Sequence, residues 1–282
     1  IINSAFYQGD ILTIYAIIGF GLIPVAKLKD SWVLIIATLL MLQPYEWINF
    51  ACALQHPEVT PANPASWAYF GKMGEYIPKD SFIDTVVGNL TNGRPAVFNW
   101  SWENGRVFQT LSLFMLGMLA GRKGLFKESD SNIRFWKKAL VISLVAFIPL
   151  YQAKTNVGTW YTSEALIRPL GVILSSWANL AFMIFLVSSF VLLYRTSLFN
   201  KALNLLAPIG RMSLSNYIIQ SILGSFIYYG FGLGMYQFTG ATHCLIIGIC
   251  LAILQGIFST WWLHVHKQGP LESLWHKATW VG

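Results

Sequence analysis

The chain of 282 residues is 55% hydrophobic and only 11% charged, with a mean hydropathy of +0.53. A soluble domain normally carries about 25% charged residues, so the composition excludes an ordinary soluble domain and predicts an integral membrane protein. The net charge of +7 would favour a nucleic-acid partner in a soluble protein, but here the basic residues lie in short loops beside apolar segments. We therefore predict a lipid bilayer, and no nucleic acid, as the partner.

Seven apolar segments are long enough to form membrane-spanning helices, which need roughly 20 apolar residues, or fewer where aromatic residues finish the ends. This predicts an all-α, polytopic helical bundle in one membrane domain over residues 1–282. The third segment is the shortest and could instead be re-entrant or buried. The seven segments are residues 8–26, 31–51, 107–121, 138–153, 168–194, 212–236 and 242–264.

The distribution of Lys and Arg predicts the orientation of the bundle, because basic residues concentrate in cytoplasmic loops. With the N-terminus outside and the C-terminus inside, 13 of the 19 basic residues fall in inner loops, against 6 outside. We therefore predict an N-out, C-in topology. The inner residues are Lys27, Lys29, Arg122, Lys123, Lys127, Arg134, Lys137, Lys138, Arg195, Lys201, Arg211, Lys267 and Lys277.

Two polar stretches stand outside the spans. Residues 52–106 form one long insert rich in turn-forming residues, which we predict to be an extracytoplasmic loop. Its Trp67, Trp100 and Trp102 either line the mouth of a substrate cavity or belong to an interfacial aromatic belt. After the last span, residues 268–280 predict a short amphipathic helix with apolar residues towards lipid and lysines towards anionic headgroups.

Asp10 is the first polar residue that a membrane would have to tolerate. It stands at the outer end of the first span, directly after Gly9. One interpretation is structural: the carboxylate caps the first helical turn and faces the positive end of the helix dipole. In the other, Asp10 borders a polar cavity and contacts a substrate or a catalytic partner.

A polar stripe runs along the sixth span. If a helix begins near residue 212, Ser213, Asn216 and Gln220 fall on one face at positions i, i+3 and i+7, with Arg211 at its cytoplasmic foot. The stripe must point into the bundle or a wet cavity. It could contact a substrate, or it could join helices through hydrogen bonds worth about 1 kcal/mol each.

The cysteines and histidines do not indicate a metal site. The three cysteines have no CxxC spacing, and His264 and His266 stand two residues apart, so that they do not share a helix face. We predict that the chain binds no metal.

Three motifs carry a resemblance to a known family. "GDILTIYAIIG" at residues 9–19, "GRMSLSNYIIQS" at 210–221 and "QGPLESLWHKAT" at 268–279 occur in this order with spans between them. The chain thereby resembles the YeiB-like bacterial membrane proteins, which share domain of unknown function 418. Ser215 and Ser273 replace residues expected as Thr and Trp in this family.

The resemblance implies a multi-pass protein of the bacterial inner (plasma) membrane, related in fold to membrane acyltransferases. Family members begin with further spans and an Asp-x-x-Arg-Gly motif, so this chain is expected to be the C-terminal part of a longer architecture. The implied reaction moves an acyl group from cytoplasmic acyl-CoA to a sugar, lipid or small-molecule acceptor. Asp10 would orient a base, Arg211 would hold a CoA phosphate, and Ser213, Asn216 and Gln220 would contact substrate.

The sequence is also compatible with two other functions. A transporter or flippase for an amphiphilic small molecule could use the same polar stripe as a path and would need no acyl donor. A purely structural subunit would respond to neither ligands nor changes in the polar residues.

Overall fold

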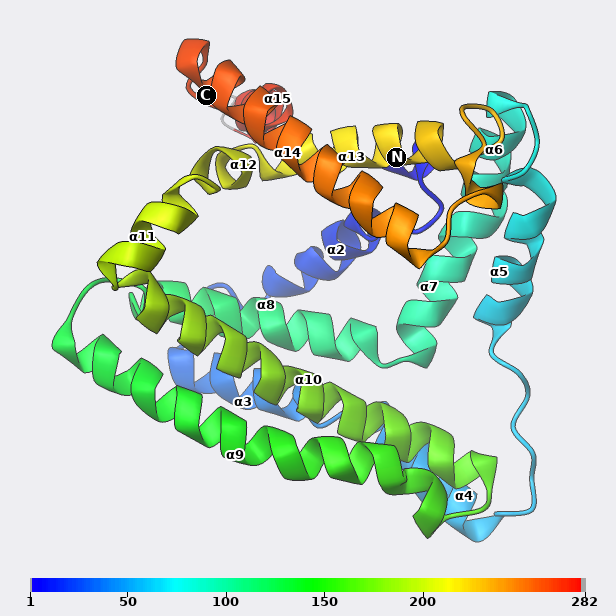
Figure 1. Ribbon diagram of the computed structural model, residues 1–282. Helices are drawn as coiled ribbons and strands as arrows, with labels where there is room; N and C mark the ends of the chain where they lie inside the picture. Colours follow the sequence, from blue (N-terminus) through cyan, green and yellow to red (C-terminus); the bar gives the residue numbers. More distant parts are fainter. Residues whose placement is uncertain (1, 280–282) are drawn as a thin grey trace. The chain divides into compact units, whose positions relative to one another are not determined.

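The computed structural model describes residues 2–279, which form helices joined by turns and loops and contain no β-strand (Figure 1). The all-α prediction is therefore confirmed. Contacts between Cα atoms divide the chain into two compact units. The first unit holds Ala68–Val97 and the described residues of Ile1–Asp10 and Thr196–Gly282, and the second holds Ile11–Trp67 and Phe98–Arg195.

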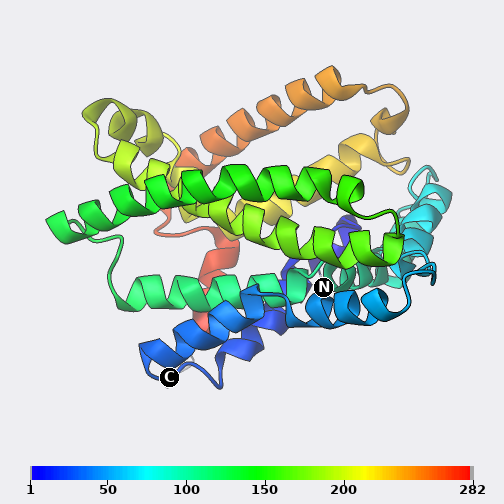
Figure 2. The same cartoon turned by 90° about the horizontal axis from the view of Figure 1, so that it is seen from below.

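The second unit is built on two helix pairs. Helices α9 (Asp130–Trp160) and α10 (Glu164–Tyr194) lie side by side, as both views show (Figure 1, Figure 2). Helices α3 (Asp30–Met41) and α8 (Arg106–Arg122) form the other pair around buried apolar side chains such as Val33 and Met115. The remaining helices that contribute to this unit are α2 (Leu12–Gly19), η1 (Phe20–Leu22), α4 (Pro44–Gln55), α5 (Ala65–Tyr76) and α7 (Arg94–Glu103).

A turn at Gln43 separates α3 from α4. Gln43 has a φ of 60°, which is uncommon for a residue other than glycine, and its side chain is fully buried. Its amide Nε2 donates hydrogen bonds to the Gly105 carbonyl (2.9 Å) and to Ser176 Oγ (3.0 Å). Pro44 then occupies the first turn of α4, where its fixed φ suits a helix start. The turn is therefore held by partners far away in the sequence.

The first unit contains the short helix α1 and the long helix α14. Contacts join α1 to α6, η2 and α13, while α12 packs against α14 and α15 against α13. Its elements are α1 (Ile2–Phe6), α6 (Phe82–Gly88), the π-helical turn η2 (Asn89–Gly93), α11 (Ser197–Asn204), α12 (Ala207–Arg211), α13 (Ser213–Tyr228), η3 (Met235–Gln237), α14 (Ala241–Val265) and α15 (Pro270–Thr279), with parts of α5 and α7.

Within residues 2–279, three segments are long and apolar enough to cross a membrane: Asp30–Gln55, Glu164–Tyr194 and Ala241–Val265. They correspond to the second, fifth and seventh of the predicted spans. The structure thus bears out three of seven spans by length and hydropathy. Three of the others are too short, because α2 has 8 residues, α13 has 16 and α8 has 17, which for α8 is about 26 Å at 1.5 Å per residue. The predicted span 138–153 lies within α9, which has 31 residues with Pro149 inside the helix and is not one of the three segments.

The polar insert, which the sequence predicts to be a loop, is largely helical. Residues 52–106 hold α5, α6, η2 and α7, and the longest part without helix is the proline-rich stretch 56–64 between α4 and α5. Ser81 opens α6 by accepting a hydrogen bond from the Asp84 backbone N–H (3.1 Å). In the predicted C-terminal segment, Pro270 opens α15, and residue 280 lies outside the described residues.

Candidate functional site

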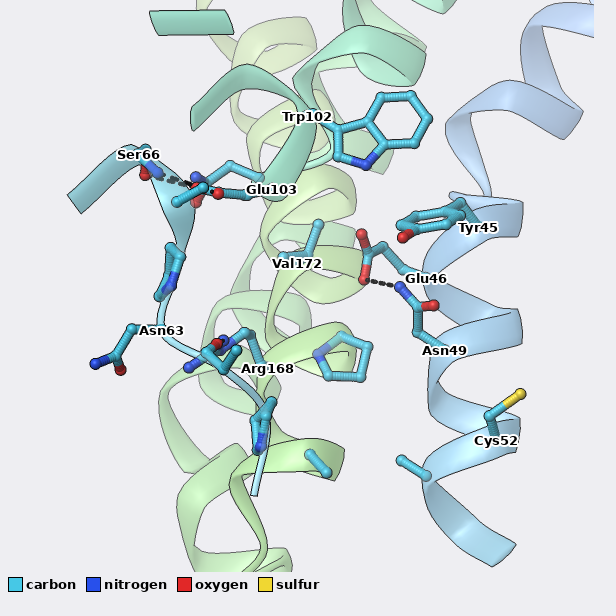
Figure 3. Close-up of a pocket in the computed structure, with 18 of the residues that line it drawn as sticks. Tyr45, Glu46, Asn49, Cys52, Asn63, Ser66, Trp102, Glu103, Arg168 and Val172 are labelled. Carbon is cyan, nitrogen blue, oxygen red and sulfur yellow. Dashed lines mark hydrogen bonds between the residues drawn. The ribbon is translucent and has the colours of Figure 1, made fainter. Parts of the chain in front are cut away.

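A pocket of about 790 Å³ lies in the second unit between α4, α10 and the segment that joins α4 to α5 (Figure 3). This volume falls within the range of roughly 300–1,000 Å³ that is typical of small-molecule sites. Charged, amide, aromatic and apolar side chains all contribute to the lining. The pocket can therefore hold a ligand that has both polar and apolar parts.

Glu46 and Asn49 stand three residues apart on α4 and lie against each other at the pocket wall (Figure 3). Asn49 Nδ2 donates a hydrogen bond to Glu46 Oε2 over 3.4 Å. Glu46 is 6% exposed and belongs to the first turn of α4, where unbonded backbone N–H groups and the helix dipole favour a carboxylate. The pocket thus contains a buried acid with a hydrogen-bond donor beside it.

Arg168 supplies the positive charge of the opposite wall. It lies near the start of α10, where its Nη2 is 3.4 Å from Glu164 Oε2, one helical turn earlier. Its Nη1 donates to the Ala62 carbonyl over 2.8 Å. The guanidinium has five N–H donors in a planar fork, so these two contacts leave donors for an anionic or carbonyl group of a ligand.

Residues 56–65, which we call the strap, run along the pocket between α4 and α5. The strap is tied at its start by Ser163 Oγ, which donates to the Pro57 carbonyl over 2.6 Å. Just past its end, Ser66 donates to the Glu103 carboxylate through its hydroxyl (2.5 Å) and its backbone N–H (3.2 Å). Together with the Arg168 contact, these bonds fix a segment that has no helix to satisfy its own backbone.

The tryptophans of the polar insert gather at this pocket. Trp67, Trp100 and Trp102 all belong to its lining. The Tyr45 ring centroid lies 5.1 Å from that of Trp102, and the Arg106 guanidinium lies 5.6 Å from the Trp100 ring. The three tryptophans therefore line a cavity, and a contact of these residues with a substrate stays a prediction.

Asp10 lies in the first unit and is 4% exposed. Asn3 Nδ2 donates to its Oδ1 over 2.8 Å, and Ser4 Oγ donates to its Oδ2 over 2.6 Å. Both donors are on α1 and are themselves buried. Burial of this carboxylate is therefore balanced by hydrogen bonds. The predicted roles of Asp10, in capping or in catalysis, stay predictions.

Asn216 connects α13 with α14. Its Nδ2 donates to Ser259 Oγ (2.9 Å) and to the Ile209 carbonyl (3.2 Å), and Ser259 Oγ lies 3.3 Å from Asn216 Oδ1. Gln255 Nε2 donates to the Asn216 backbone carbonyl (2.9 Å). Asn216 thus has the hydrogen bonds that the helix-joining interpretation requires, and a substrate contact by this residue stays a prediction.

The other three residues of the predicted stripe are exposed in the structure. Ser213 and Gln220 lie on the same face of α13 as Asn216 by their spacing, but both are exposed whereas Asn216 is buried. Arg211 donates to the Lys267 backbone carbonyl over 2.9 Å. The structure therefore brings together Asn216 and α14, and it brings Arg211 to the segment before α15, all within the first unit.

The sequence analysis does not predict the pocket residues Glu46 and Asn49 as site residues. Glu46 itself indicates the site, because "PYEWIN" places a carboxylate inside an apolar segment of membrane-crossing length. The partner wall could not be inferred, since Arg168 comes from a helix more than a hundred residues later. None of Asp10, Arg211 and the stripe residues belongs to the lining of this pocket.

These features define a class of protein: a helical chain with three apolar helical segments of membrane-crossing length and a ligand-sized pocket beside two of them. Residues 120–282 match the family described as "Protein of unknown function (DUF418)". The chain belongs to this family, which confirms the predicted resemblance. No solved structure matches the chain.

Three bacterial relatives illustrate the similarity. "Uncharacterized protein YxaH" of Bacillus subtilis (strain 168) is 28% identical over 288 residues, which cover 98% of this chain and 67% of the relative. "Uncharacterized protein YeiB" of Escherichia coli (strain K12) is 35% identical over 74 residues, 26% of this chain and 19% of the relative. An "Uncharacterized 39.9 kDa protein in amylase 3'region" of Bacillus acidopullulyticus is 26% identical over 62% of this chain and 53% of the relative. The chain thus matches about two thirds of YxaH and smaller parts of the other two.

Proposed function

We propose that this protein is a membrane-embedded acyltransferase that moves an acyl group from cytoplasmic acyl-CoA to a sugar, lipid or small-molecule acceptor. In this proposal the pocket beside Glu46 holds the acceptor. The observation that carries the proposal is the buried Glu46 carboxylate, which lines a cavity of about 790 Å³ and accepts a hydrogen bond from Asn49. Transfer to a hydroxyl or amine needs a general base in a positioned, partly dry site, and carboxylates serve as such bases.

The proposal places the chain as a multi-pass protein in the bacterial inner (plasma) membrane. Three apolar segments of sufficient length support a membrane location, and the three bacterial relatives support a bacterial source. We retain the N-out, C-in arrangement of seven spans, in which the shorter helices α2, α8 and α13 contribute. In that topology α4 runs outward and α10 runs inward, so the pocket opens on the extracytoplasmic side, where acceptors arrive.

The proposed reaction needs one base and one polarising donor. Glu46 takes the proton of the acceptor hydroxyl while the hydroxyl oxygen attacks the thioester carbonyl carbon. The carbon–sulfur bond then breaks, CoA leaves as a thiolate that takes up a proton from water, and Glu46 returns its proton to solvent. Arg168 is placed on the facing wall to polarise a carbonyl or hold an anionic group of the acceptor.

The residues of the first unit keep the roles that the family resemblance implies. Asp10 would orient a base or border a cavity, Arg211 would hold a CoA phosphate, and Ser213, Asn216 and Gln220 would contact substrate. The exposed position of Arg211 suits an anionic ligand, because a guanidinium binds phosphate through two parallel N–H groups. No metal takes part in this proposal.

The test is transfer of label from acetyl-CoA to acceptors in a membrane extract, with the chain purified in detergent. Glu46→Gln should lower transfer by about 10²- to 10⁴-fold, the usual contribution of a general base. Glu58→Gln is the matched control, because Glu58 is an exposed acid of the strap and does not line the pocket. Transfer that is equal in the Glu46→Gln variant and the control, with both folded, would remove Glu46 from the mechanism.

The second candidate is a transporter or flippase for an amphiphilic small molecule. The aromatic lining favours it, because Tyr45, Trp100 and Trp102 offer apolar faces next to the polar Glu46 and Asn49 without requiring an acyl donor. The two functions differ in their response to CoA thioesters. Acetyl-CoA should raise the melting temperature of an acyltransferase and leave that of a transporter unchanged.

A further inference from the structure

A second cavity, of about 620 Å³, lies in the second unit at the C-terminal end of α10. One wall is apolar and comes from α10, where Leu186 and Phe190 are half exposed. The other wall comes from the connection between α8 and α9, with Phe126 exposed to a similar degree. The cavity is therefore an open apolar groove between two parts of one compact unit.

The connection that forms the second wall is held in place by α9. Helix α8 ends at a left-handed turn, with Gly124 at a φ of 58°. Trp136 Nε1 donates to the Leu125 carbonyl over 2.8 Å, and Asn132 Nδ2 donates to the Lys127 carbonyl over 2.9 Å. Two side chains of α9 thus set the backbone of the groove wall, so the groove is a built feature of the fold.

Two cations stand at this groove. Lys127 and Arg195 both belong to its lining, and neither forms an ion pair within 4 Å with a carboxylate of residues 2–279. Glu128 also lines the groove, so these three side chains leave a net charge of +1. Arg195 comes one residue after Tyr194, the last residue of an apolar segment of membrane-crossing length. Arg195 therefore lies at the end of the apolar wall, and Lys127 lies on the other wall of the groove.

We propose that this groove binds an anionic phospholipid, with an acyl chain against Leu186, Phe190 and Phe126 and the phosphate between Lys127 and Arg195. The proposal rests on the membrane location given under the proposed function, but it does not depend on acyl transfer. In that topology the groove faces the cytoplasmic leaflet, whose anionic lipids attract basic residues near the headgroups. An apolar wall with Lys127 and Arg195 beside it is complementary to the acyl chain and the phosphate of a phospholipid.

Lipid retention by the purified chain tests the proposal. The chain in neutral detergent is incubated with phosphatidylglycerol or with phosphatidylcholine of the same acyl chains, and bound lipid is measured by native mass spectrometry. Each cation near a headgroup contributes about fivefold in affinity, so Lys127→Gln with Arg195→Gln should weaken phosphatidylglycerol binding about 25-fold. Phosphatidylcholine binding should be weaker than that of phosphatidylglycerol in the parent chain and should change little in the variant.

A matched double variant controls for net charge. Arg134→Gln with Lys138→Gln removes one arginine and one lysine from exposed positions of α9 outside the groove and should leave phosphatidylglycerol binding unchanged. Equal loss in both double variants, or equal binding of the two lipids, would overturn the proposal. Displacement of phosphatidylglycerol by equimolar palmitoyl-CoA, but not by inorganic phosphate, would assign the groove to an acyl donor instead. Because no reaction is measured, the outcome stands apart from any failure of the acyltransferase proposal.

Discussion

The side chain of Glu272, on α15, forms hydrogen bonds with the N-terminal turn of α13, and the side chain of Ser215, on α13, forms one with the N-terminal turn of α15. Glu272 Oε1 accepts hydrogen bonds from the backbone N–H groups of Leu214 (2.8 Å) and Ser215 (3.0 Å), in the first turn of α13. Ser215 Oγ donates to Glu272 Oε2 and accepts the backbone N–H of Leu271 (3.1 Å), in the first turn of α15. One carboxylate and one hydroxyl thus satisfy N–H groups that have no partner within their own helices.

Loss of this carboxylate should destabilise the first unit. Glu272→Ala removes the acceptor of two backbone N–H groups and of the buried Ser215 hydroxyl, so we expect the free energy of unfolding to fall by about 1–3 kcal/mol. Gly269→Ala should act in the same direction, because a Cβ at Gly269 would clash with Glu272 Oε2. Denaturant unfolding in detergent measures both changes. The exposed acid Glu75, in the same unit, is the control, and its change to Ala should stay within about 0.5 kcal/mol.

The same carboxylate predicts a dependence of stability on pH. Burial alone would raise the pKa of Glu272, but hydrogen bonds from Ser215 and Leu214 outweigh it and hold the pKa below its ordinary value of 4.5. A lowered pKa means that the contribution to stability is complete above the unfolded-state pKa and is lost as the pH falls through the folded-state pKa. The difference in unfolding free energy between parent and Glu272→Gln should therefore be constant near neutrality and shrink below about pH 4.5. A difference that persists unchanged at pH 3 would contradict this assignment.

The sequence predicts the helical class and the strongest spans because these depend on composition and on uninterrupted apolar runs. The segment Asp30–Gln55 shows the limit, since its hydropathy indicates a single span whereas Gln43 breaks it into α3 and α4. That break depends on the Gly105 carbonyl and on Ser176, which are 62 and 133 residues away. The hydropathy of a local segment does not indicate hydrogen-bond partners that are so far away in the sequence.

The motifs show a similar limit. The register of Ser213, Asn216 and Gln220 predicts a helix that the structure begins at Ser213. Register alone cannot tell which of the three is buried, because that depends on where α14 packs. The hydrogen bonds between Glu272 and Ser215 could not be predicted from spacing either, although both residues stand in the motifs that carry the family resemblance. Spacing in the sequence indicates shared faces of one helix and says little about contacts between helices.

Asn216 and Ser259 should be coupled energetically if they join α13 to α14. Interhelical hydrogen bonds in membrane proteins contribute about 0.6 kcal/mol on average, with a maximum near 1.7. A double-mutant cycle of Asn216→Leu and Ser259→Ala should give a coupling of this size in unfolding free energy. Gln220→Leu, an exposed change on the same helix, should show no coupling to Ser259→Ala. Additive effects of the first pair, with loss of acyl transfer in Asn216→Leu, would favour a substrate contact over the structural one.

Gly105 should be the least replaceable glycine of the second unit. Its φ is +63°, and a Cβ would lie 2.6 Å from Gln43 Oε1 and 2.8 Å from Val172 Cγ1. Gly105→Ala therefore combines an unfavourable backbone conformation with a clash against a buried amide, and we expect a loss of about 1–3 kcal/mol in unfolding free energy. Gly117→Ala in the neighbouring helix α8 is the control, because a Cβ there meets open space and should stabilise the helix by about 0.5–1 kcal/mol. Equal melting temperatures for the two variants would contradict the role of Gly105.

The strap should loosen when its two ends are released together. Ser163→Ala removes the bond to the Pro57 carbonyl, and Ser66→Ala removes the hydroxyl bond to Glu103, each worth about 0.5–1.5 kcal/mol. Because residues 56–65 have few other ties, amide hydrogen exchange in this segment should speed up about 5- to 50-fold in the double variant, while exchange in α9 stays unchanged. Thr162→Ala is the matched control, since its exposed hydroxyl lies next to Ser163 and makes no hydrogen bond to the strap. Unchanged exchange in the double variant would show that the Arg168 contact with Ala62 is sufficient to hold the strap in place beside the Glu46 pocket.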